Sequence, residues 1–126
     1  MPRRAASLLA LCLSAAAAAG CGGGPTAAVK DRTISVTLDE YRIVPQRISA
    51  PAGRLRVTVR NEGLLTHNLV IEPDPGHPGE TRRKTRTLHS GQRTEKSFRL
   101  RPGTYRIVCT IANHEALGQY GTLIVR

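Results

Sequence analysis

The segment CTIANHEALGQYG, residues 109–121, carries three side chains at regular intervals that could bind a metal. His114 lies five positions after Cys109, and Gln119 lies five positions after His114. A thiolate and an imidazole are common metal ligands, whereas an amide is an unusual one. The spacing raises three possibilities: a metal site with an uncommon ligand, a metal site that has lost a ligand, or no site.

Alternation of apolar and polar residues predicts β-strands before and around this segment. It is clear in residues 33–38, 54–60 and 104–109, and a period of two is typical of half-buried strands. Turn-forming sequences such as Pro51-Ala52-Gly53 separate the strands, and no segment shows a sustained helical period. Many short strands with frequent turns predict an all-β Greek-key β-sandwich, with a small barrel as the alternative.

The alternation also predicts where the candidate ligands point. His67 and Cys109 are each in phase with the apolar positions of their own strands, so each is expected at one end of a strand, facing the interior. His114 and Gln119 follow in the loop before a closing strand at residues 121–125. This arrangement could bring four side chains to one end of a sandwich.

One thiolate, two imidazoles and a weak axial donor suit a mononuclear copper ion in both oxidation states. Zinc is the alternative, because one cysteine and two histidines can bind it. Structural zinc needs a strong fourth ligand, however, and an amide oxygen from Gln119 is a weak one. The residues therefore favour copper. His77 and His89 lie in a polar, basic insertion and are expected at the surface, with a weak second metal site as the alternative.

Several segments taken together resemble the cupredoxins, the family of blue, type 1 copper proteins. The resemblance covers nearly the whole predicted domain and is most specific in Cys109, His114 and the segment Gly118-Gln119-Tyr120-Gly121. It implies a cupredoxin-like β-sandwich. It also implies that Asn68, beside the first ligand, ties its strand to the cysteine loop through Thr110.

The resemblance implies one type 1 copper ion bound by His67, Cys109 and His114, with Gln119 at the axial position. Most members carry methionine there, but Met1 is the only methionine of this chain. The stellacyanin branch uses glutamine at this spacing, and a harder oxygen donor implies a lower reduction potential than a methionine site. The alternative is that Gln119 is a solvated loop residue that never touches metal.

The N-terminal segment is similar to a bacterial lipoprotein signal. Residues 1–20 carry two arginines followed by an apolar run, and the run ends in Ala19-Gly20-Cys21. We therefore expect a signal peptide at 1–20, a lipidated Cys21 with a flexible tether over 21–30, and a single cupredoxin-like domain at 31–126. Ordinary secretory cleavage and a retained anchor helix are the alternatives. A lipoprotein would lie on the extracytoplasmic side, in the periplasm or at the cell exterior.

Removal of the signal and lipidation of Cys21 would leave Cys109 as the only cysteine of the folded domain. Exported proteins normally use cysteines in pairs. A single cysteine is then an inert buried thiol, half of an intermolecular bridge, or a thiol kept for chemistry.

The positive charge of the chain bears on its partners. The formal net charge is +10, and much of it lies in Thr81–Arg86. An exported chain rarely meets nucleic acid, so an acidic redox protein or anionic lipid headgroups are the expected partners. A solvated basic loop is the alternative.

These features predict a membrane-anchored, extracytoplasmic one-electron carrier, expected to be a monomer. No catalytic triad, phosphate-binding loop or pair of carboxylates placed for acid–base chemistry occurs in the sequence, so we expect no enzyme. One alternative is a copper-binding or copper-delivery module. Another is a cupredoxin-like domain without copper that binds a protein or a lipid.

Overall fold

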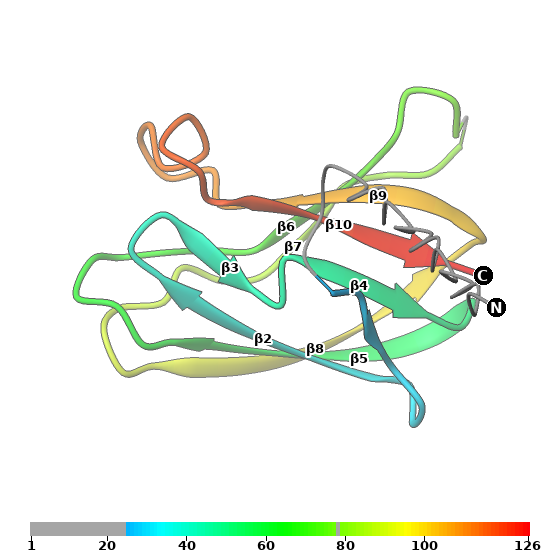
Figure 1. Ribbon diagram of the computed structural model, residues 1–126, viewed down its shortest axis with the longest axis horizontal. Coiled ribbons are helices and arrows are strands. Elements are labelled where there is room, and N and C mark those ends of the chain that lie inside the picture. Colours follow the sequence, from blue (N-terminus) through cyan, green and yellow to red (C-terminus); the bar gives the residue numbers. More distant parts are fainter. Residues whose placement is uncertain (1–24, 78) are drawn as a thin grey trace, which may run out of the picture.

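The computed structural model of the chain describes residues 25–77 and 79–126. The predicted signal peptide, residues 1–20, and the predicted lipidation site, Cys21, lie outside the described residues. The described chain is built of strands joined by turns and loops, as the alternating sequence predicts. Two sheets face one another in a sandwich (Figure 1). The predicted all-β sandwich is therefore confirmed.

The first sheet has six strands in the spatial order β1-β4-β10-β9-β6-β7. Its strands β4 and β10 pair in parallel, whereas β10 and β9 are antiparallel. The strand bounds are β1 (Ala27–Ala28), β4 (Arg47–Ala50), β6 (Val70–Pro73), β7 (Arg83–Lys84), β9 (Gly103–Val108) and β10 (Tyr120–Val125).

The second sheet has four strands in the order β3-β2-β5-β8. Its strands β2 and β5 pair in parallel, and β8 pairs with β5 in antiparallel register. The strand bounds are β2 (Thr33–Asp39), β3 (Arg42–Val44), β5 (Gly53–Asn61) and β8 (Arg93–Leu100).

The core lies between the two sheets and is filled by the apolar phase of the strands. In β5, for example, Leu55, Val57 and Val59 are fully buried, while Arg54 and Arg56, which alternate with them, are exposed. Tyr105 and Ile107 of β9, in the first sheet, belong to the same core. This burial of alternate residues is the driving force for the sandwich.

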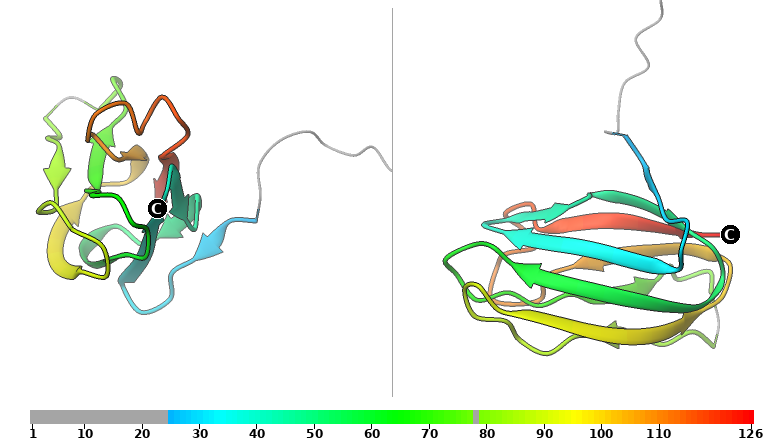
Figure 2. Two further views of the ribbon diagram at one scale, coloured as in Figure 1. Left: turned by 90° about the vertical axis from the view of Figure 1, so that its left-hand side faces the viewer. Right: turned by 90° about the horizontal axis from the view of Figure 1, so that it is seen from below.

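Three connections gather at one end of the sandwich and form the surroundings of the candidate ligands. They are the β2–β3 turn (residues 40–41), the β5–β6 loop (residues 62–69) and the ligand loop (residues 110–119). In Figure 1 all three lie on the left, and the C-terminus lies at the opposite end. Figure 2 shows from two further sides that the same connections close one end of the sandwich.

Candidate metal centre

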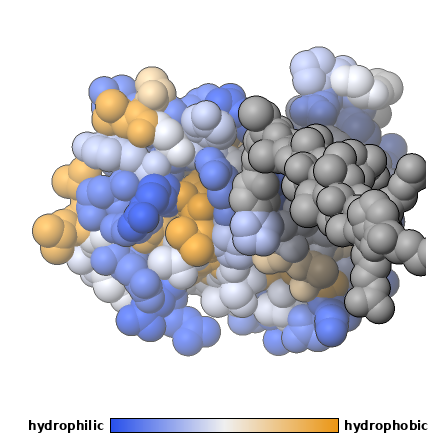
Figure 3. Space-filling view, viewed as in Figure 1, coloured by the Kyte–Doolittle hydropathy of each residue, from blue (hydrophilic) through white to orange (hydrophobic). Residues whose placement is uncertain are grey.

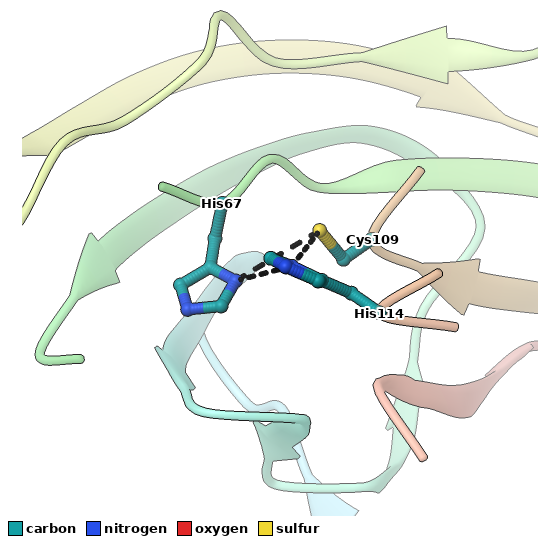
Figure 4. Close-up of side chains that lie close together, drawn as sticks. All are labelled: His67, Cys109 and His114. Carbon is teal, nitrogen blue, oxygen red and sulfur yellow. Dashed lines mark hydrogen bonds between the residues drawn. The ribbon is translucent and has the colours of Figure 1, made fainter. Parts of the chain in front are cut away.

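Three donor atoms from distant parts of the sequence converge at this end of the sandwich. The Sγ atom of Cys109 lies 3.9 Å from Nδ1 of His67 and 3.6 Å from Nδ1 of His114. The two Nδ1 atoms are 3.2 Å apart. Figure 4 shows all three side chains pointing toward a common centre. Among the described residues, they form the group of histidine, cysteine and acidic side chains that could hold a metal ion.

The local structure that carries each donor differs in detail from the prediction. His67 precedes β6 and is held by a bridge to Leu88, in which each backbone N–H donates to the carbonyl of the other residue at 3.0 and 2.8 Å. Cys109 directly follows β9 rather than ending it. Both side chains still face the interior and have no exposed surface. The predicted direction is therefore confirmed, whereas the predicted strand ends are off by one to three residues.

The ligand loop is folded by its own backbone hydrogen bonds. The N–H groups of Leu117 and Gln119 both donate to the carbonyl of His114, at 3.2 and 3.0 Å, and Gly118 donates to Glu115 at 3.0 Å. This series of turns places His114 above Cys109 with only 7% of its surface exposed. Its ring also meets Tyr41 of the β2–β3 turn edge to face, with ring centroids 5.4 Å apart.

The side chain of Asn68 connects the segment of the first histidine to the start of the ligand loop. Its Oδ1 accepts the backbone N–H of Thr110 at 2.9 Å, and its Nδ2 donates to the Thr110 hydroxyl at 3.1 Å. Two bonds between one amide and one residue restrict the relative movement of the two segments. The contact expected from the family resemblance is present.

Gln119 is fully buried beside this group. Its side-chain Nε2 donates to the carbonyls of Asp39 and Arg42, at 2.9 and 3.2 Å. Since an amide nitrogen can only donate and both neighbours are acceptors, the orientation of this amide is fixed by the bonds it makes. Its Oε1 is buried and has no hydrogen-bond partner within residues 25–77 and 79–126. The alternative of a solvated loop residue is therefore wrong.

Burial controls the protonation of the first histidine. It lowers the pKa of His67 below its ordinary value, and the neighbouring His114 lowers it further, while Glu40 and Gln119 act in the opposite direction. A lowered pKa keeps the imidazole neutral near pH 7. A neutral ring has a free nitrogen lone pair, which a metal ligand requires.

One further contact could not be predicted from the sequence. Oε1 of Glu40, in the β2–β3 turn, lies 3.7 Å from Nε2 of His67, the ring nitrogen on the side away from Cys109. Periodicity could not reveal it, because the two residues belong to irregular segments of different sheets.

The three donors fit a single metal ion. Their separations place one point in their plane at roughly 2.1 Å from all three atoms, within the range of metal bonds to imidazole nitrogen (about 2.0–2.1 Å) and thiolate sulfur (about 2.3 Å) known for zinc. The side chain of Gln119, whose Oε1 has no hydrogen-bond partner among the described residues, lies close enough to His67 to affect the pKa of its ring. One thiolate and two imidazoles in a plane with a weak donor nearby is the ligand set preferred by type 1 copper.

Comparison with known families agrees with this geometry. The family model of the cupredoxin-like domain matches residues 4–125 of the chain. The chain belongs to the cupredoxin-like domain family. No curated protein matches this cupredoxin-like chain.

Solved structures show the same fold. Dithionite-reduced auracyanin from Roseiflexus castenholzii is 23% identical, with a TM-score of 0.68 over 76% of this cupredoxin-like chain and 98% of its own. Rusticyanin from Thiobacillus ferrooxidans is 21% identical, with a TM-score of 0.62 over 85% and 86%. A copper-containing nitrite reductase from Thermus scotoductus is 18% identical, with a TM-score of 0.58, but the match covers 28% of that enzyme and 80% of this chain.

The two other histidines of the domain stand apart from the candidate centre. His89 is exposed and contacts the Thr66 hydroxyl through Nδ1 at 3.3 Å. His77 is half-buried and stacks on Tyr105 with ring centroids 6.0 Å apart. His89 is at the surface as expected, and His77 is partly exposed while one face of its ring packs on Tyr105.

The basic insertion is bonded to its surroundings. Arg82 pairs with Glu72, and Arg83 contacts Glu80 at 3.4 Å. Arg86 donates to the side chain of Gln92 at 3.0 Å and to the backbone carbonyl of Arg93 at 2.8 Å. Much of this positive charge is thus engaged within the domain.

Within residues 25–77 and 79–126, no helix has the length and hydropathy needed to cross a bilayer.

Proposed function

We propose that this cupredoxin-like chain is a one-electron carrier with a type 1 copper site, whose ligands are His67, Cys109, His114 and, at the axial position, Gln119. The observation that carries the proposal is the convergence of three buried donor atoms within 3.9 Å of one another. When bound at these residues, copper supplies one-electron chemistry between Cu(II) and Cu(I).

The protein residues hold the donors in place before any metal binds. Cys109 and His67 are fixed by backbone hydrogen bonds on both sides of the site, and the Asn68–Thr110 contact ties their segments together. Such a site changes little in geometry when the charge of the ion changes, which favours rapid electron transfer. All four candidate ligands are buried, with His114 the least so at 7% exposed, and this limited access for a substrate supports a carrier rather than an enzyme.

The axial assignment of Gln119 rests on its orphaned oxygen. The amide nitrogen is committed to the β2–β3 turn, and only Oε1 is free to face a metal. An amide oxygen is a harder donor than a thioether and stabilises Cu(II) relative to Cu(I). The proposed site is therefore of the stellacyanin-like kind, with a reduction potential below that of a methionine site.

The surface around His114 suits a docking protein. His114 is the candidate ligand with exposed surface, and the exposed apolar side chains Leu64, Leu65 and Leu117 belong to the same end of the sandwich. Figure 3 shows apolar surface at its left-hand end, where Figure 1 places the ligand loop and the β5–β6 loop. We infer that electrons leave through His114 to a redox protein that docks on this end.

Attachment to the membrane is a separate part of the proposal. Cys21 follows small residues and an apolar run, so we propose a lipid anchor at Cys21 and an extracytoplasmic location. Expression of the full chain with Cys21→Ala in a bacterial host tests it. The variant is expected to move from the membrane fraction to the soluble fraction, and equal retention of both proteins would contradict an anchor at this residue.

Copper binding is tested by adding Cu(II) to the purified chain and recording visible absorption and electron paramagnetic resonance spectra. A type 1 site gives an intense thiolate-to-copper band and narrow copper hyperfine splitting. A colourless protein would favour the copper-free domain. Colour without electron exchange with any redox protein would favour a copper-binding or delivery module.

A further inference from the structure

The β2–β3 turn touches three of the four candidate ligands although it supplies none. The carbonyls of Asp39 and Arg42, at its two ends, bind the Gln119 amide. Tyr41 packs against the ring of His114, and Glu40 approaches His67. This turn belongs to the second sheet, whereas the ligands belong to the first sheet and its loops. The turn therefore contacts the candidate ligands from outside the site, and it can affect a bound metal only through those ligands.

The carboxylate of Glu40 is held in a defined position. Its Oε1 accepts the backbone N–H groups of Leu64 and Leu65, at 2.6 and 2.8 Å. Gly63 leaves room for it, because a Cβ atom on that residue would lie 2.9 Å from the Glu40 Cδ and closer still to Oε1. Two hydrogen bonds and the space left by Gly63 hold this carboxylate in one position. Its negative charge therefore stays at a fixed place, unlike the charge of a freely moving surface side chain.

Within the described part of the chain, the ring nitrogen that this carboxylate faces has no hydrogen-bond partner. Nε2 of His67 is buried and makes no hydrogen bond among the described residues. Oε1 of Glu40 lies 3.7 Å away, which is longer than a direct hydrogen bond but close enough for the negative carboxylate to attract the N–H dipole of a neutral ring. A histidine that binds a metal through Nδ1 carries its proton on Nε2. The carboxylate thus faces the N–H of the form that binds metal.

We propose that Glu40 is a positioning residue of the copper site: it holds His67 in the Nε2–H form, with Nδ1 free for the metal, and its negative charge lowers the reduction potential. The second part rests on the proposed function, whereas the first part concerns the copper-free chain as well. A carboxylate beside the outer nitrogen of a ligand imidazole raises the electron donation of that ring. The greater donation and the nearby charge both favour Cu(II).

The test uses Glu40→Gln, which removes the charge while keeping an oxygen that can accept the N–H groups of Leu64 and Leu65. The matched control is Glu62→Gln. Glu62 directly follows β5, at the same end of the sandwich as Glu40, but it is exposed and pairs with Arg60 rather than with His67. In redox titrations of the copper-loaded full chains, Glu40→Gln is expected to favour Cu(I) about tenfold. That change corresponds to a rise of about 59 mV for one electron. Glu62→Gln is expected to leave the potential near the wild-type value.

A second readout needs no copper. Nitrogen NMR of the His67 ring in the copper-free chain, at a pH where the ring is neutral, reports which nitrogen carries the proton. The wild type and Glu62→Gln are expected in the Nε2–H form, and Glu40→Gln is expected to shift toward Nδ1–H. Equal shifts of potential in the two variants, or no change in either readout with Glu40→Gln, would overturn the proposal. A wild-type chain that forms no blue site would refute the proposed function, and the NMR measurement would still decide whether Glu40 orients His67.

Discussion

The backbone N–H of Cys109 donates to the carbonyl of Gln119 at 3.0 Å, so the candidate ligand that precedes the ligand loop is joined directly to the one that ends it. The loop between them leaves the first sheet and returns to it at one point. The separation of these two ligands is thus set by a main-chain hydrogen bond, and it does not depend on a metal.

Replacement of Cys109 by serine should remove the visible band of the copper-loaded chain. A hydroxyl cannot supply the thiolate donor from which the charge-transfer band arises. The domain should stay folded, because Cys109 forms no disulfide within the described residues. Visible absorption and far-UV circular dichroism check the two outcomes, and an unchanged band would exclude Cys109 as a ligand.

Replacement of Gln119 by methionine should have two separable effects. The copper-loaded chain should gain a higher potential, because a thioether favours Cu(I) more than an amide oxygen does. The copper-free chain should lose about 1–3 kcal/mol of unfolding free energy, because the carbonyls of Asp39 and Arg42 lose their donor. Redox titration and urea unfolding measure these changes.

The control for this variant is Gln46→Met, which alters an exposed glutamine that donates to the carbonyl of Tyr120 at 3.2 Å. It should change neither the potential nor the copper spectrum. If Gln119→Met gave the same potential as the wild type, the amide oxygen would not be an axial ligand.

Replacement of Asn68 by alanine should weaken metal binding without removing a ligand. Both bonds to Thr110 would be lost, and the start of the ligand loop would move more freely. Loss of a residue that orients metal ligands typically costs roughly 10–100-fold in metal affinity. Competition with a copper chelator measures the affinity. Asn113→Ala, at an exposed position of the same loop, is the control and should retain wild-type affinity.

The stability of the copper-free chain should depend on pH through His67. Since burial lowers the pKa of this ring in the folded state, the unfolded chain binds more protons below the ordinary value of about 6.5. Stability should be complete above that pH and should fall as the pH drops from there toward the lowered value in the folded state. Urea midpoints at pH 7.5 and pH 5.5 measure this effect, and His67→Gln should flatten the difference. An equally steep dependence in that variant would assign it to other groups.

Replacement of Gly63 by alanine should displace the Glu40 carboxylate without altering its charge. The added Cβ would overlap that carboxylate, so the potential should rise as it is expected to do in Glu40→Gln. Gly76→Ala is the control, because a Cβ at Gly76 would meet no atom of the described residues within 4 Å, and the backbone of Gly76 does not have the positive φ that favours glycine. An unchanged potential in Gly63→Ala, together with a rise in Glu40→Gln, would mean that the carboxylate keeps its place by another route.

The strands with strong alternation, β2, β5 and β9, could be predicted from the sequence, because each buries one face against the core. Strand β8 could not, because only Phe98 and Leu100 of its eight residues are buried and its other side chains read as a solvated segment. The short strands β1 and β7 have two residues each. Both are defined only by their pairing with a neighbouring strand, and the local sequence pattern cannot predict such pairing.

At the site, the two histidines and the cysteine could be predicted because their chemistry and spacing are specific. The Asn68–Thr110 contact could be expected only through the family resemblance. The role of the β2–β3 turn could not be predicted, since Glu40 and His67 are 27 positions apart in the sequence and meet only when the two sheets close. The burial of Gln119 was likewise decided by tertiary packing, because a glutamine in a polar loop is more often exposed.

The ligand loop forms no strand, folds by its own turns and is closed by the bond between Cys109 and Gln119. Changes in the number of residues within it therefore need not disturb the registers of β9 and β10. The fold separates a scaffold that must be kept from a short insert that can be exchanged. Replacement of this one loop is therefore expected to change the metal site and leave the sheets intact, as long as the closing hydrogen bond and the segment of His67 are retained.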